Sequence, residues 1–93
     1  MGFELGQVVC TRGVWSEMAD NNEFVKFVSD SFDKYTMCDW GQTCDEDKPL
    51  NDNAVKNGND RILAVYEKEG LPKIWIITEW DRSTTTILFP SEY

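Results

Sequence analysis

The sequence predicts an α+β fold in two layers, in which two helices pack on a mainly antiparallel sheet of about four strands. Three short apolar or β-branched runs follow one another late in the chain, at residues 61–67, 74–80 and 84–89. Before them, the apolar residues of segment 23–37 recur at helical spacing. The predicted order is strand, helix, helix and three strands, and residues 1–93 form a single domain.

The run at residues 74–80 is the most apolar in the chain and organises the predicted sheet. Because side chains alternate along a strand, Ile74 and Ile76 face one side of it. Trp75 and Ile77 then face the other side. A strand that is apolar on both faces is typical of the middle of a sheet, so we expect it to be central and covered on both sides.

The N-terminal half is predicted to contain one strand followed by helices. Residues 5–12 favour a strand because Val8, Val9 and Thr11 are β-branched. A short helical turn is expected next, at residues 14–19.

Since the three later strands are joined by short turns, we expect those strands to pair antiparallel.

Two helices are predicted between the first strand and the other three. The helix at residues 23–37 carries an apolar stripe at Phe24, Val28 and Phe32. We expect this stripe to pack on the isoleucines of the sheet. The second helix, at residues 45–57, begins with three acidic residues, which suit a helix N-terminus, and is followed by a glycine that favours its end.

The composition is strongly acidic. The chain has 17 acidic residues, nine basic residues and no histidine, which gives a formal net charge of −8. A nucleic-acid-binding protein needs a basic surface to neutralise phosphates, so direct binding to DNA, RNA or anionic lipid is disfavoured. A basic partner, including a protein that itself binds nucleic acid, is favoured. The simpler alternative is that acidity keeps a small domain in solution.

The sequence also bears on the compartment of the protein. No run of about 18 apolar residues is present, so we expect no membrane-spanning helix. We likewise expect no signal peptide, because the first residues lack a basic region followed by an apolar one. Three cysteines are an odd number, which argues against a disulfide framework and favours reduced thiols in a cytoplasm.

Few residues offer catalytic chemistry. Without histidine, Ser-His-Asp and Cys-His nucleophiles are excluded, and the usual general base near neutral pH is missing. Glu79 and Asp81 form a pair of carboxylates that could act in a small hydrolase, but two acids beside a turn are usually plain surface. We therefore expect a protein that is not an enzyme and requires no cofactor.

A metal site is the next candidate. Cys38 and Cys44 bracket a loop that contains Gly41, and with Cys10 they could hold a structural zinc ion. Their spacing is wider than the separation of about two to four residues that is typical of zinc ligands, and no second pair exists. The alternative is three small, partly buried thiols.

The acidity of the predicted helical half is the strongest remaining feature. Carboxylates on an outer helical layer can present spaced negative charges like a phosphate backbone and so occupy a basic nucleic-acid-binding groove. The candidate partner-binding residues are Asp30, Asp33, Asp45, Glu46, Asp47 and Asp52. The alternative is a solvated helical face. Trp15, Trp40 and Trp80 are expected in the core, with Trp40 the weakest candidate, and any of them that is exposed could anchor a partner.

Five segments together resemble a known family. They are residues 8–14, 39–41, 44–47, 74–83 and 89–93, which include the specific stretches Trp-Ile-Ile-Thr-Glu and Asp-Arg-Ser. These segments are similar to those of small acidic bacterial proteins that occur on plasmids, conjugative elements and phages. The resemblance covers nearly the whole chain and supplies no catalytic residues. Because such mobile-element proteins include many anti-CRISPR and anti-restriction inhibitors, the resemblance implies a counter-defence role.

Charge and resemblance together indicate a non-enzymatic anti-CRISPR inhibitor of a type II effector nuclease. It would bind a basic surface of the nuclease through the acidic helical face and block nucleic-acid loading. The alternatives are an anti-restriction DNA mimic and a metal-stabilised accessory module of a mobile element. The sequence leaves open the target, the docked surface and whether the protein is a monomer or a dimer through an edge strand such as residues 84–89.

Overall fold

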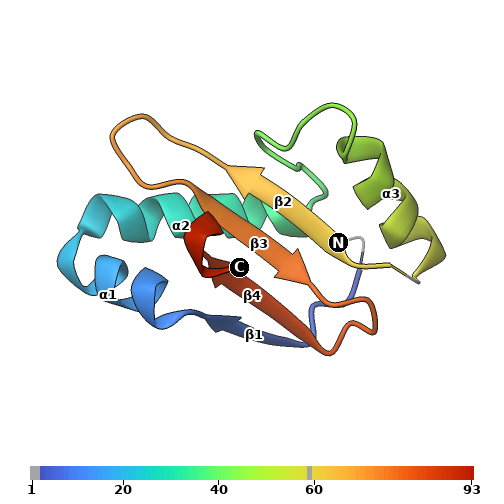
Figure 1. Cartoon of the computed structure of the whole chain (residues 1–93), viewed down its shortest axis with the longest axis horizontal. Coiled ribbons are helices and arrows are strands. Elements are labelled where there is room, and N and C mark those ends of the chain that lie inside the picture. Colours follow the sequence, from blue (N-terminus) through green and yellow to red (C-terminus); the bar gives the residue numbers. More distant parts are fainter. Residues whose placement is uncertain (1–2, 59) are drawn as a thin grey trace.

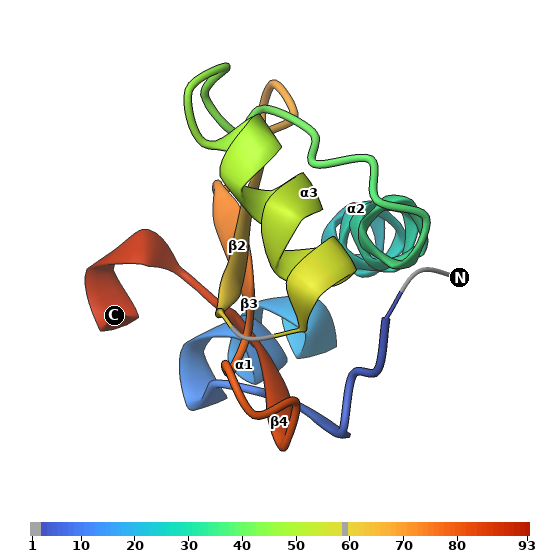
Figure 2. The ribbon, with the colours of Figure 1, turned by 90° about the vertical axis from the view of Figure 1, so that its right-hand side faces the viewer.

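The computed structural model describes residues 3–58 and 60–93, and this part of the chain has the predicted α+β fold (Figure 1). The elements are β1 (Gln7–Cys10), α1 (Arg12–Asp20), α2 (Asn22–Thr36), α3 (Lys48–Asn57), β2 (Ile62–Tyr66), β3 (Ile74–Thr78), β4 (Thr84–Leu88) and a 3₁₀ turn, η1 (Pro90–Glu92). Figure 2 shows α2 and α3 on the same side of the sheet. None of the helices described is long and apolar enough to cross a bilayer.

The four strands form one mixed sheet in the order β1-β4-β3-β2. The pairs β2–β3 and β3–β4 are antiparallel, as their short connections predict, whereas β1 runs parallel to β4. The whole helical half separates β1 from β4 in the chain, so no turn dictates the direction of β1. Because β4 lies between β1 and β3, the prediction of an edge strand at residues 84–89 was wrong, and the edges are β1 and β2.

The core lies between the helical layer and the sheet, as predicted. Phe24 and Val28 of α2 are buried in it, and Phe32 packs at its margin. The sheet contributes Ile62, Ile74 and Ile76, all fully buried. These contacts confirm that the helical periodicity of α2 marks the face that packs on the strands.

The N-terminal region contains one more α-helix than predicted. The strand expected at residues 5–12 spans only Gln7–Cys10, and α1 begins at Arg12. Thr11 takes the N-cap position, where its hydroxyl accepts a hydrogen bond from the backbone N–H of Val14 at 3.3 Å. A threonine that caps a helix satisfies one of the free N–H groups of its first turn, so Thr11 ends the strand and starts the helix.

The strand β3 is central, but its two faces are covered differently. The C-terminal turn η1 lies on the side of the sheet opposite α2 and α3 (Figure 2). On that side the Trp75 ring packs edge-on against the Tyr93 ring, with 5.6 Å between ring centroids. The guanidinium of Arg61 lies 5.7 Å from the centre of the same Tyr93 ring. The second cover predicted for β3 is therefore the C-terminal turn, not a second helical layer.

Two buried tyrosines make stability sensitive to alkaline pH. Burial raises the pKa of Tyr35 and of Tyr66, whose hydroxyl donates a hydrogen bond to the backbone oxygen of Asp39 at 2.7 Å. The ordinary tyrosine pKa of about 10 applies to the unfolded chain, which therefore loses these protons first. The stability contributed by the neutral phenols is complete below about pH 10 and falls as the pH rises above it.

We therefore expect the urea midpoint of unfolding to be lower at about pH 11 than at about pH 8. Tyr66→Phe is the control, because it removes one of the two phenols and should reduce the decrease. A decrease that is the same in Tyr66→Phe and in the original protein would contradict the role of this buried phenol.

Candidate partner-binding surface

The predicted carboxylates all lie on the helical side of the molecule or in the turn that leads to it. Their members, here called the acidic surface, are Asp30 and Asp33 in α2, Asp45, Glu46 and Asp47 before α3, and Asp52 in α3, and all are exposed. α3 begins at Lys48, later than predicted, with Pro49 in its first turn and Asp47 at its N-cap. Three consecutive acidic side chains therefore stand in a turn instead of a helix, which leaves them open to a partner.

Two members of the acidic surface pair with lysines on the same segment. Asp30 Oδ2 lies 3.5 Å from Lys26 Nζ, and Asp45 Oδ1 lies 3.8 Å from Lys48 Nζ. Exposed ion pairs of this kind contribute less than about 1 kcal/mol to stability. A basic partner can therefore displace either lysine at little cost.

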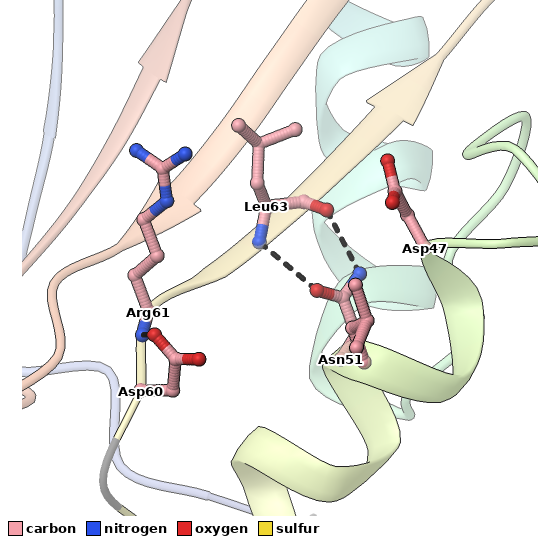
Figure 3. A pocket seen from close by; sticks show the side chains of 6 residues that line it. Asp47, Asn51, Asp60, Arg61 and Leu63 are labelled. Carbon is pink, nitrogen blue, oxygen red and sulfur yellow. Dashed lines mark hydrogen bonds between the residues drawn. The ribbon is translucent and has the colours of Figure 1, made fainter.

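Two hollows beside β2 add acidic residues that the sequence did not single out. One, of about 370 Å³, is lined by Asp47 and Asp60 and also by the basic side chain of Arg61 (Figure 3). The second, of about 240 Å³, lies between α2 and the end of β2 and is lined by Asp30 and Glu67 together with two lysines. Asp60 and Glu67 stand just before and just after β2, and their places at the two ends of a strand beside the helices are the signal that could have identified them.

The tryptophans differ from the prediction in a way that affects the surface. Trp40, the weakest core candidate, is only 4% exposed, and its Nε1–H donates to Asp52 Oδ1 at 2.8 Å. Trp15 and Trp80, which were expected in the core, are 65% and 64% exposed. Trp15 borders a small apolar hollow between α1 and α2. The hydrogen bond from Trp40 holds Asp52 against the loop before α3. This carboxylate therefore stabilises the loop and is also a member of the acidic surface.

The predicted cysteine site lies in the loop between α2 and α3. Cys38 is partly buried and Cys44 is exposed. Burial raises the pKa of the Cys38 thiol, and the negative charge of Asp52 raises it further, which disfavours the thiolate that binds zinc. Residues 3–58 and 60–93 contain no group of three or more His, Cys, Asp or Glu side chains placed to hold a metal ion. Zinc at Cys38 and Cys44 stays a prediction.

The carboxylates considered for hydrolysis belong to the turn between β3 and β4. Asp81 Oδ1 accepts a hydrogen bond from the backbone N–H of Ser83 at 3.0 Å. Hydrogen bonds from Ser83 lower the pKa of Asp81, so this carboxyl is poorly suited to act as an acid near neutral pH. The backbone N–H of Glu79 donates to the carbonyl oxygen of Thr84 at 3.0 Å. The geometry gives both residues a clear role in forming the turn.

The fold and its surface define a small α+β domain with a helical layer that is rich in exposed carboxylates. Comparison with known proteins adds no relative, since no family model, no curated protein and no solved structure matches the chain. Charge, exposure and position of the carboxylates are therefore the observations from which a function has to be argued.

Proposed function

We propose that this chain is a non-enzymatic inhibitor that binds a basic nucleic-acid-binding surface of another protein and blocks nucleic-acid loading. The observation that supports the proposal is the exposure of all members of the acidic surface in a chain whose net charge is −8. The resemblance to small acidic proteins of plasmids and phages makes a type II CRISPR effector nuclease the proposed target, in the cytoplasm of a bacterial host cell.

A protein of this charge is suited to a basic groove for two physical reasons. Opposite potentials steer the two proteins together and raise the association rate. Carboxylates that meet arginine or lysine side chains also form charge-assisted hydrogen bonds, which are stronger than neutral ones. The consecutive acidic residues at positions 45–47 can offer several such acceptors within one turn of the chain.

Hydrogen bonds hold α3, which carries part of the acidic surface, against neighbouring segments of the fold. Asn51 of α3 donates a hydrogen bond to the carbonyl oxygen of Leu63 at 2.8 Å and accepts one from the Leu63 N–H at 3.2 Å (Figure 3). Near the other end of α3, the guanidinium of Arg82 donates to the carbonyl oxygen of Ala54 at 2.7 Å. These bonds fix α3 against the sheet, so less ordering entropy is lost when Asp52 and the turn that leads into α3 bind a partner.

The decisive variant is Asp45→Lys combined with Glu46→Lys. Because it replaces attraction by repulsion at two contacts, we expect binding to the nuclease to weaken by about tenfold or more at low salt. We also expect a flatter dependence of affinity on salt, since fewer ionic contacts are left to screen. Both effects can be measured in one assay. The purified nuclease cleaves target DNA at two salt concentrations, and the inhibition of that cleavage by each variant is compared.

Glu69→Lys combined with Glu79→Lys is the matched control, since it makes the same change of charge at exposed residues outside the acidic surface. If the two variants lose inhibition equally, the loss depends on net charge alone. That result would refute a localised contact at the acidic surface. Inhibition of a purified restriction enzyme but not of the nuclease would assign the acidic surface to anti-restriction instead.

A further inference from the structure

The segment that follows β4 is fixed at its start and attached only lightly beyond it. The ring of Phe89 packs against the fully buried Phe24, with 5.9 Å between ring centroids. Among the described residues, the backbone hydrogen bonds of residues 90–93 stay within the turn η1 and its cap, Phe89. Beyond Phe89, this segment therefore depends on its side chains for its attachment to the fold.

Two side chains provide that attachment. Glu92 Oε1 accepts a hydrogen bond from the hydroxyl of Thr11 at 2.6 Å. The ring of Tyr93 packs edge-on against Trp75 and lies beside the guanidinium of Arg61. Both Glu92 and Tyr93 are exposed, and the exposed fraction of Tyr93 is 67%. The far end of the segment is therefore held by contacts that lie at the surface of the molecule.

The contact made by Glu92 lies at the first turn of α1. Thr11 is the N-cap of this helix, and its hydroxyl accepts from the N–H of Val14 while it donates to Glu92. A carboxylate is favoured there, because the free N–H groups of a helix N-terminus carry a partial positive charge. The hydrogen bond from Thr11 lowers the pKa of Glu92. A Cβ atom at Gly13 would lie 2.4 Å from Glu92 Oε2, so glycine at this position leaves room for the carboxylate.

We propose that residues 90–93 form a strap over the outer face of the sheet, which opens by releasing Glu92 and Tyr93 while the rest of the fold stays intact. Such a local opening requires much less free energy than global unfolding, because it breaks few buried contacts. In the open state Trp75 loses the ring that covers it. Figure 2 shows the strap on the side of the sheet opposite α2 and α3, so the strap does not rest on the function proposed for the acidic surface.

Fluorine NMR of protein labelled with fluorotryptophan tests the opening, and Trp75→Phe assigns the resonance of Trp75. In Glu92→Ala we expect this resonance to move, and to become more sensitive to the exchange of H₂O for D₂O, because the ring meets more solvent. The resonance of Trp40 should stay in place, since that ring is only 4% exposed and lies in the core. An unchanged Trp75 resonance in Glu92→Ala, or a movement of Trp40 as large as that of Trp75, would overturn the proposal.

The same spectra show whether the strap opens in the original protein. On warming below the unfolding transition, the Trp75 resonance should move toward its position in Glu92→Ala, and Trp40 should change only at unfolding. Glu46→Ala is the matched control, since it removes an exposed carboxylate from the turn before α3 and should leave the Trp75 resonance in place. If Trp75 in the original protein changes only together with Trp40, at unfolding, residues 90–93 are a static turn and the proposal fails.

Gly13→Ala opens the strap without changing any residue of it. Because its Cβ atom displaces the Glu92 carboxylate, we expect the Trp75 resonance to move as it does in Glu92→Ala. Alanine is the better helix former, so Gly13→Ala should raise the urea midpoint when Glu92 is already alanine. In the original protein the same change should be less favourable, since it also breaks the contact between Glu92 and Thr11. Equal shifts of the midpoint in the two backgrounds would refute the attachment of the strap at α1.

Discussion

Asn51→Asp is expected to lower the free energy of unfolding by about 3–4 kcal/mol. The Asn51 amide donates to the carbonyl oxygen of Leu63 and accepts from its N–H, and the side chain is only 5% exposed. A carboxylate keeps the acceptor but loses the donor, and it places a negative charge against the Leu63 carbonyl. The change therefore removes one hydrogen bond and leaves a buried charge without compensation.

Urea denaturation of Asn51→Asp should be compared with that of Asn53→Asp, which adds the same charge at an exposed position of the same helix. We expect Asn53→Asp to stay within about 0.5 kcal/mol of the original protein. The folded state raises the pKa of the introduced carboxyl group, so Asn51→Asp should regain stability as the pH falls through that pKa. Equal destabilisation of the two variants would refute the role of Asn51 as the cap of the β2 edge.

Thr78→Val is expected to lower the free energy of unfolding by about 2 kcal/mol, because it interrupts a buried chain of hydroxyl groups. Thr85 Oγ1 donates to the carbonyl oxygen of Leu5 at 2.7 Å, so it must accept from Thr78 at 2.8 Å. Thr78 then accepts from the hydroxyl of Tyr35 at 2.7 Å. This row of hydroxyl groups connects α2 to the N-terminal segment across β3 and β4. Valine keeps the shape of the threonine side chain but removes the central hydroxyl.

Thr86→Val is the matched control for Thr78→Val, since Thr86 lies in β4 with its side chain on the other face of the sheet. We expect it to be neutral within about 0.5 kcal/mol. Tyr35→Phe combined with Thr78→Val should cost less than the sum of the two single changes, because the pair leaves no buried hydroxyl without a partner. Additive losses in thermal or urea unfolding would show that the two groups do not act as one network.

The candidate surface could be predicted largely from composition, because charged side chains are seldom buried without a partner. The carboxylates of α2, of the turn before α3 and of α3 are all exposed, as the sequence predicts. The sequence did not identify Asp60 and Glu67, which line hollows with Asp47 and Asp30. Those hollows arise where α2 and α3 meet β2, so they depend on how separate elements pack and not on a local pattern.

The amino-acid sequence by itself determined the elements whose cause is local. The stripe of α2, the glycine stop after α3 and the short turns of the β2-β3-β4 meander each depend on residues a few positions apart, so periodicity and turn chemistry are sufficient to predict them.

Only the tertiary structure decided that β1 lies parallel beside β4, that Trp40 is buried while Trp15 is exposed, and that Asn51 caps the β2 edge. Each of these depends on contacts between separate elements of the fold, where the cost of loop closure and the gain from packing set the outcome, and no local pattern records either.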